Sequence, residues 1–315
     1  MANYNNGNYI QEAIESVIHQ NFSDWELLIM DDGSTDDSIA RINAYLNDKR
    51  ISLIRHASNK GKVLSLIELV HQSKSNILGV LDSDDALSKD ALSVMYGKHI
   101  KHDDCGFIYS QFIFCDNNLD SICEGFCRSI PKGETNLRSI YSSAFRTYKK
   151  NYYMKTEGYN ENFIYGQDRD IVFKMEEVTK LLFVEKVLYK HRVLSNSISN
   201  DPRKKMLGHF LLIKAKHDAF CRRSESQIPN LTKKEMSIEL CIASIICFRL
   251  YRRNDCLDCF KSAIDLNYLL LISMINYLIK KTFKRLGHLF RPSAVGTEFR
   301  YTKVNKEIQK QLRAA

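Results

Sequence analysis

The chain has 315 residues, of which 44% are hydrophobic and 26% charged, a composition ordinary for a folded globular protein. Its four Pro and 13 Gly argue against a long disordered linker. The net charge of +9 is uneven: residues 1–200 carry 23 Lys and Arg against 27 Asp and Glu, whereas residues 201–315 carry 23 against 10. We therefore expect two parts with different roles, the basic one suited to nucleic acid, an anionic membrane or an acidic partner.

Nine Cys residues stand at irregular spacing, and the polar N-terminal stretch has no secretory signal. We expect reduced cytosolic thiols. Cys256 and Cys259 form a Cys-x-x-Cys pair, but a structural zinc site needs about four ligands, and the other close pair, Cys123 and Cys127, lies far along the chain. No zinc site is therefore expected.

Apolar spacing predicts short strands that alternate with helices in the first 200 residues. In chain order we expect a helix at 8–20, a strand at 25–30, a helix through Ile39 and Ile42, a strand at 51–55, a helix at 62–72, a strand at 77–81, a helix at 88–101, a strand at 106–114, a helix after Gly166 and a strand at 181–189. Such alternation indicates an α/β protein with parallel strands, whose ligands lie at the carboxyl ends of the strands. Beyond residue 202 we expect only helices, including a hairpin of 233–252 and 256–266.

An acidic cluster follows the predicted strand at 77–81. The segment LDSDD places Asp82, Asp84 and Asp85 within four residues, and like charges this close repel unless a cation is bound. Capping of the next helix would explain one acid but not three. Carboxylate oxygens suit Mg²⁺ or Mn²⁺, so the sequence favours a metal site here.

Two further acidic groups are each open to a structural and a functional interpretation. Asp31 and Asp32, in IMDDGSTDD, form either a turn or part of a ligand site at a strand end. Asp168, in YGQDRD, is either a helix cap or a general base. No Gly-rich phosphate loop of the P-loop or dinucleotide type is present, so a bound nucleotide would be held through a metal.

Three segments, in this order and spacing, resemble glycosyltransferase family 2, a family of inverting enzymes with the GT-A fold. They are NYNNGNYIQEAIESVIHQNFSDWELLIMDDGSTDDS, LDSDD and GYNENFIYGQDRDIVFKM. The resemblance covers about residues 1–200. It implies an α/β GT-A nucleotide-diphospho-sugar transferase fold, with a mixed, mostly parallel sheet and flanking helices at 1–202, and a basic helical C-terminal region at 203–315.

The resemblance also implies how the donor is bound. Asp32 would hydrogen-bond the base of the nucleotide, with Asn3 and Tyr4 in the polar turn beside it. Asp84 would hold Mg²⁺ or Mn²⁺ on the diphosphate, and Asp82 would bind the ribose or the metal.

For the reaction, the resemblance implies that Asp168 takes the proton of the acceptor hydroxyl as it attacks the anomeric carbon, while the metal stabilises the leaving diphosphate. The chain departs from the family pattern at Gln167, where Glu is usual, and at Leu194, where a His that assists the metal is usual. His191 lies three residues earlier, and because a lone His is more often structural, we do not assign it to the metal.

In this family an apolar strand in the middle of the sheet runs directly into the turn at Asn3 and Tyr4. Here only Met1 and Ala2 precede the turn. We therefore expect that the first strand is missing apart from these final residues and that Met1 is an internal residue of a longer gene product. A missing central strand would leave backbone groups of its neighbours unpaired.

The most apolar run, residues 266–279, is shorter than the roughly 20 residues that span a membrane. Basic residues with interleaved aromatic and Leu side chains follow at 280–291. The pattern suits either a helix on an anionic membrane surface or a helix that packs on the protein with a solvated basic face. No nucleic-acid-binding motif is present, so nucleic acid is not an expected partner.

We expect a bacterial, metal-dependent inverting glycosyltransferase that moves a sugar from a nucleotide-sugar, with UDP-sugar the first choice. The acceptor would be a hydroxyl of a growing surface polysaccharide, such as a capsule or lipopolysaccharide side chain, or of a lipid-linked saccharide. Its expected location is the cytoplasm, with peripheral contact to the inner face of the membrane. The alternatives are a non-catalytic truncated remnant or binding subunit and a sugar nucleotidyltransferase, although the latter needs a Gly-rich basic loop.

Overall fold

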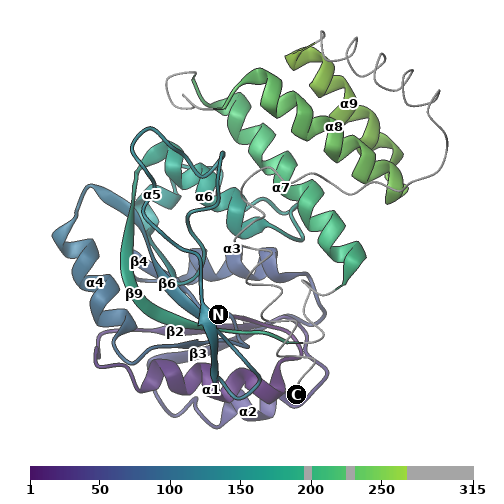
Figure 1. Cartoon of the computed structure of the whole chain (residues 1–315). Coiled ribbons are helices and arrows are strands. Elements are labelled where there is room, and N and C mark those ends of the chain that lie inside the picture. The colour runs from purple at the N-terminus through teal and green to yellow at the C-terminus, as the bar shows by residue number, and fades with distance from the viewer. Residues whose placement is uncertain (195–200, 225–230, 268–315) are drawn as a thin grey trace. The chain divides into compact units, whose positions relative to one another are not determined.

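The computed structural model describes residues 1–194, 201–224 and 231–267, and the chain divides into two compact units (Figure 1). Within the described residues, the first unit comprises 1–130 and 140–194, and the second comprises 131–139 together with the helices after residue 201. The domain boundary predicted after residue 202 stays a prediction.

The first unit is an α/β structure. Its elements are β1 (Ala2–Asn3), α1 (Gly7–Ile18), β2 (Leu27–Asp31), α2 (Ser38–Asn43), β3 (Ile51–Arg55), α3 (Lys62–Gln72), β4 (Ile77–Val80), β5 (Ala86–Leu87), α4 (Ala91–Lys101), β6 (Cys105–Cys115), β7 (Ser121–Glu124), β8 (Arg146–Lys149), α5 (Lys150–Tyr153), α6 (Gln167–Val178) and β9 (Lys180–Arg192). All the strands and helices predicted from the sequence in this unit are present, with small differences at their ends. The short elements β5, β7, β8 and α5 were not predicted.

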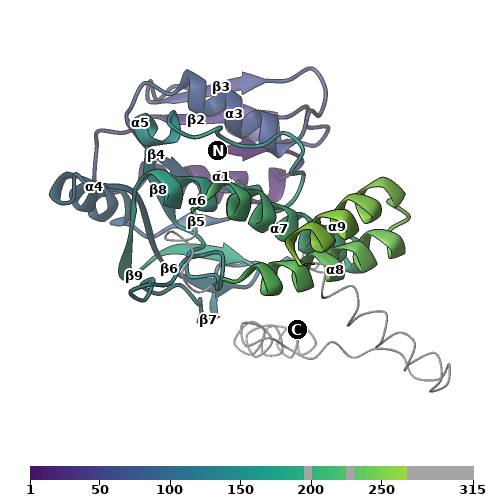
Figure 2. The same cartoon turned by 90° about the horizontal axis from the view of Figure 1, so that it is seen from above.

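The N-terminal strands form a parallel sheet in the order β1-β2-β3. Helices α1 and α2 lie on one face of this sheet and α3 lies on the other, as the two views show (Figures 1 and 2). Ile10, Ile14 and Val17 of α1 recur at helical spacing and are buried, because one stripe of the helix faces the core. Because β1 and β2 run parallel, their carboxyl ends meet at one edge of the sheet.

The first strand, β1, is short and pairs with β2. Ala2 and Asn3 pair in parallel with Met30 and Asp31. The carbonyl of Met1 also accepts a hydrogen bond from the backbone N–H of Met30, at 2.9 Å. This pairing places Asn3 directly beside Asp31.

A second, mixed sheet has the strand order β4-β8-β6-β9-β5, with β7 paired to β6. Strands β6 and β9 run parallel, whereas the other neighbours in this sheet are antiparallel. Buried aromatic side chains of β6 and β8 pack together, and Phe107 stacks on Tyr148 with their ring centroids 6.4 Å apart. Strand β8 pairs with β4, and in the chain it comes directly after the irregular stretch that follows β7.

The second unit contains three helices in its described part: α7 (Pro202–Arg222), α8 (Lys233–Arg249) and α9 (Arg253–Leu266). The carboxylate of Asp201 caps α7, and Thr232 and Glu235 form a capping box at the start of α8. Helices α8 and α9 form the predicted hairpin. Residues 268–291 of the predicted basic helix lie outside the described residues, and none of the described helices has the length and apolar character needed to cross a bilayer.

We predict that Phe107→Ala destabilises the first unit. The Phe107 side chain is fully buried on β6, so its removal leaves a cavity and should lower the free energy of unfolding by about 3–5 kcal/mol. Urea denaturation followed by circular dichroism measures the change. Ile100→Ala is the matched control, because Ile100 is 62% exposed on α4 and its truncation should change stability little. Equal effects of the two substitutions would contradict the prediction.

Candidate active site

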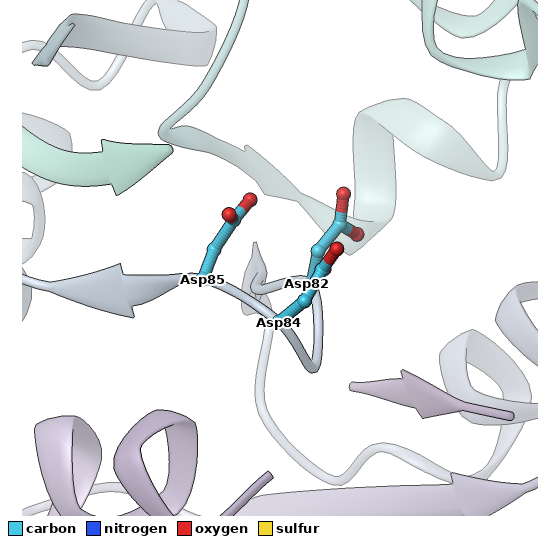
Figure 3. A group of neighbouring side chains, drawn as sticks. All are labelled: Asp82, Asp84 and Asp85. Carbon is cyan, nitrogen blue, oxygen red and sulfur yellow. The ribbon is translucent and has the colours of Figure 1, made fainter. Parts of the chain in front are cut away.

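The acidic cluster lies in the turn between β4 and β5. One carboxylate oxygen from each of Asp82, Asp84 and Asp85 lies within 4.8 Å of the others. Figure 3 shows the three side chains leaving this turn with their carboxyl groups on the same side of it. Burial, together with the charges of Asp85 and Asp82, raises the pKa of Asp84 to about 6. The sequence-predicted cluster is therefore formed, and it carries unfavourable negative charge.

Two of these acids are balanced by protein groups. Burial opposes ionisation of Asp82, but the Nζ atom of Lys62, 2.7 Å from its Oδ1, holds the pKa of Asp82 down at about 2. Asp85 is buried and accepts hydrogen bonds from the Tyr189 hydroxyl and the Arg192 backbone N–H, both at 2.7 Å. Asp85 thereby ties the turn to β9.

The carboxylate of the third acid, Asp84, has no hydrogen bond or ion pair from another described residue, whereas its backbone carbonyl accepts a hydrogen bond from Nε of Arg192 at 2.7 Å. Its carboxylate lies next to Asp82, and hard oxygen donors of this kind are the ligands that Mg²⁺ and Mn²⁺ prefer. The donor set therefore fits a divalent cation at Asp84 and Asp82. Asp85 is not counted in this set, because its carboxylate already accepts hydrogen bonds from β9.

His191 lies at the same cluster, a location that its place in the sequence did not predict. Its Nδ1 atom is 3.1 Å from Oδ2 of Asp85. Burial would lower its pKa, but the carboxylate of Asp85 and its neighbours raise it to about 9. His191 is thus a cation beside the acids, whereas Leu194, at the position where the family has its His, is a buried apolar residue.

At the end of β2, Asp31 and Asp32 organise two loops. Asp31 accepts hydrogen bonds from Nδ2 of Asn3 at 2.8 Å and from the backbone N–H of Ser34 at 3.0 Å. The Oδ1 atom of Asn3 is buried and has no hydrogen-bond partner among the residues that the structure describes. Tyr4, in contrast, is 45% exposed. The predicted donor-binding residues Asn3 and Asp32 are therefore buried at one sheet edge, with Tyr4 at the surface.

Asp168 lies in the first turn of α6. The helix N-cap is Gly166, which has no side chain, and Asp168 lies two residues further on, so Asp168 is not the N-cap residue. Its Oδ2 atom lies 3.1 Å from Nη1 of Arg146 and 3.7 Å from Nε of Arg169. Burial opposes ionisation, but Arg169, Arg146 and Lys62 lower the pKa of Asp168, which is therefore a carboxylate at neutral pH.

Arg146 connects Asp168 with the acidic cluster. It opposes Val80 in the antiparallel pairing of β8 with β4, two residues before Asp82. Burial lowers its pKa, but the charges of Asp168 and Asp82 are among those that raise it above its usual value. Sequence reasoning missed Arg146 because it lies in the stretch without clear periodicity, and only the pairing of β8 with β4 brings it to the site.

A parallel sheet with helices on both faces and a second, mixed sheet, with carboxylates directly after β2 and β4, define the class of protein as an α/β protein of the GT-A fold. The structure shares this fold with S. aureus TarS 1-349 in complex with UDP, with a TM-score of 0.56 at 13% identity over 94% of this chain and 93% of that one. The mannosyltransferase PcManGT from Pyrobaculum calidifontis, in complex with GDP-Man and Mn²⁺, has a TM-score of 0.55 at 13% identity over 88% and 79% of the two chains.

Residues 1–159 match the family model described as glycosyl transferase family 2, and the chain belongs to this family. The chondroitin synthase of Pasteurella multocida strain Pm70 is 30% identical over 215 residues, which are 67% of this chain and 22% of that protein. The chain spans between 20% and 28% of the length of the chondroitin and hyaluronan synthases that it matches. The predicted family and the predicted fold are confirmed.

We predict that Asp84→Asn stabilises the metal-free chain. The raised pKa means that ionised Asp84 disfavours the folded state, so the gain should be on the order of 1 kcal/mol above pH 6. It should disappear as the pH falls from about 6 towards the ordinary value of 3.8, because wild-type Asp84 is then protonated in both states. Thermal unfolding at a series of pH values measures this difference.

The same variant should lose the stabilisation that Mn²⁺ gives to the wild-type chain, because a metal ligand is removed. Exposed Asp24→Asn is the control and should change neither the pH dependence nor the effect of Mn²⁺. An Asp84→Asn variant that is still stabilised by Mn²⁺ would contradict the assignment of Asp84 to the cation.

Proposed function

We propose that this chain is an inverting glycosyltransferase that moves a sugar from a nucleotide-sugar, with UDP-sugar as the donor, to a hydroxyl of a saccharide acceptor. The observation that carries the proposal is the position of Arg146. It pairs with Asp168, the candidate base, and its charge also interacts with Asp82 of the candidate metal site. Base and metal site therefore belong to one site.

The donor side of this site would use the acids at the strand ends. Asp84 and Asp82 would hold Mg²⁺ or Mn²⁺, and the bound ion would supply positive charge for the diphosphate that leaves. Asp32 would accept a hydrogen bond from the base, and Asn3 and Tyr4 would lie beside the nucleotide. UDP in the related fold of TarS and Mn²⁺ in that of PcManGT support this choice of ligands.

The acceptor side would use Asp168. A sugar hydroxyl is a poor nucleophile, and a positioned carboxylate that takes its proton accelerates the attack. Arg146 and Arg169 keep this carboxylate ionised and fix its position. Attack on the face opposite the leaving group inverts the anomeric centre.

For the biological role, we propose synthesis of a bacterial surface polysaccharide on a saccharide or lipid-linked acceptor. The likeness to a chondroitin synthase supports a polysaccharide product. We further propose a cytoplasmic location with peripheral membrane contact through the basic C-terminal region, for which the excess of Lys and Arg after residue 200 is the supporting feature. Membership in family 2 disfavours the alternative of a nucleotidyltransferase.

We predict that UDP binds in the presence of Mn²⁺ and that Asp84→Ala abolishes this binding. Calorimetric titration of UDP, with and without Mn²⁺, measures it. A folded wild-type chain that binds no UDP under either condition would contradict the proposed donor.

We predict that Asp168→Asn lowers turnover by about 10²–10⁴-fold while UDP affinity stays within a few-fold of wild type, because the base acts on the acceptor and not on the nucleotide. Release of UDP from UDP-glucose and UDP-GlcNAc with Mn²⁺, with water or added saccharides as acceptor, measures turnover. Exposed Glu161→Gln, a few residues earlier, is the control and should leave turnover unchanged. UDP binding without turnover by the wild-type chain would instead identify a non-catalytic binding subunit.

A further inference from the structure

A buried histidine joins two carboxylates behind the candidate base-binding residue. His56 directly follows β3, and its side chain is only 4% exposed. Its Nδ1 atom lies 2.6 Å from Oδ1 of Asp32, and its Nε2 atom lies 3.1 Å from Oε2 of Glu68 on α3. A neutral imidazole donates through one nitrogen alone, so two carboxylate partners require the ring to carry both protons. His56 is therefore an imidazolium between two acids.

The charged groups around the ring agree with this protonation state. Burial opposes the charge, but the hydrogen bonds to Asp32 and Glu68 raise the pKa of His56 above its usual value. The charge of Lys60 lowers it, and the Nζ atom of Lys60 itself lies 3.4 Å from Oε1 of Glu68. The groups that face the ring thus come from the end of β2, from α3 and from the loop before α3.

Asp32 also holds the loop between β3 and α3. Its Oδ1 atom accepts a second hydrogen bond, from the backbone N–H of Lys60 at 2.9 Å, and its Oδ2 atom accepts one from the backbone N–H of Gly61 at 2.7 Å. Gly61 has a φ of +100°, which a residue with a side chain adopts only with strain, and it is the N-cap of α3. A carboxylate oxygen offers two acceptor positions, so Oδ1 is filled by His56 and Lys60, whereas Oδ2 keeps one position open.

We propose that His56 is a positioning residue for donor recognition: it fixes Asp32 so that the open position on Oδ2 accepts an N–H from the base of the bound nucleotide. This inference rests on the proposed function, which assigns the base to Asp32. It identifies the base chemically, as one with a ring N–H donor such as uracil, and disfavours cytosine, which has an acceptor at the same ring position. The sequence offered no signal for His56, because Glu68 and Asp32 reach it only through the fold.

The test compares the binding of UDP and CDP, with Mn²⁺, to the whole chain and its variants by calorimetry. His56→Asn keeps an N–H near the position of Nδ1, towards Asp32, whereas His56→Gln keeps one near the position of Nε2, towards Glu68. We expect wild type and His56→Asn to prefer UDP over CDP, and His56→Gln to lose about tenfold or more of that preference, the worth of one charge-assisted hydrogen bond. His71→Asn, at an exposed His of the same helix α3, is the control.

A second variant tests which contact of His56 matters. Glu68→Gln removes one of the two acids that raise the pKa of His56, but a neutral ring that keeps its proton on Nδ1 still donates to Asp32. We therefore expect Glu68→Gln to keep the preference for UDP over CDP close to that of wild type.

The outcomes separate the two proposals. Absence of UDP binding by the wild-type chain overturns the proposed function and this inference with it. UDP binding by wild type, with an unchanged UDP-to-CDP ratio in folded His56→Gln, overturns the inference alone, and so does a loss of the UDP preference in folded Glu68→Gln. Equal weakening of UDP and CDP in His56→Gln also overturns it, because that result describes a structural role.

Discussion

Repulsion among the carboxylates of the turn after β4 is the constraint on which the rest of the site depends. Three acids whose oxygens lie within 4.8 Å are unstable as a free-standing group. The fold resolves this differently for each of them: Lys62 pairs with Asp82, donors of β9 hydrogen-bond Asp85, and the carboxylate of Asp84 has no such partner among the described residues. The protein therefore balances the negative charge of this turn only in part, and the remaining charge fits a divalent cation.

The same principle extends across the site to the candidate base. Asp168 forms an ion pair with Arg146 of β8. The charge of Asp82 also contributes to raising the pKa of Arg146. His56 has the same role at Asp32, the candidate base-binding residue, because its ring lies between the carboxylates of Asp32 and Glu68. Asp168 and Asp32, the acids proposed to contact the acceptor and the base, are therefore each held by a cationic side chain from another part of the fold, which fixes the direction of the carboxylate as well as its charge.

The sequence predicted what is encoded locally and missed what the sheet brings together. Acids directly after apolar runs were visible as strand-end groups, because the strand and its acids are adjacent in the chain. Arg146 and His56 were invisible, because their partners lie 22 and 24 residues away along the chain and meet them only through strand pairing and loop packing. The short strands β7 and β8 were missed for a related reason: four residues are too few to show a period, and their pairing with longer strands is what defines them.

The tie between Asp85 and β9 has a consequence for how the protein is made. Tyr189 and Arg192 lie 104 and 107 residues beyond Asp85, so the donors that neutralise this acid leave the ribosome long after the turn that needs them. Until then the acidic turn of the nascent chain lacks the partners that Asp85 has in the folded protein. Closing such long loops is slow, and we therefore expect the turn to acquire its final shape as one of the last events of folding, once β9 has inserted beside β6.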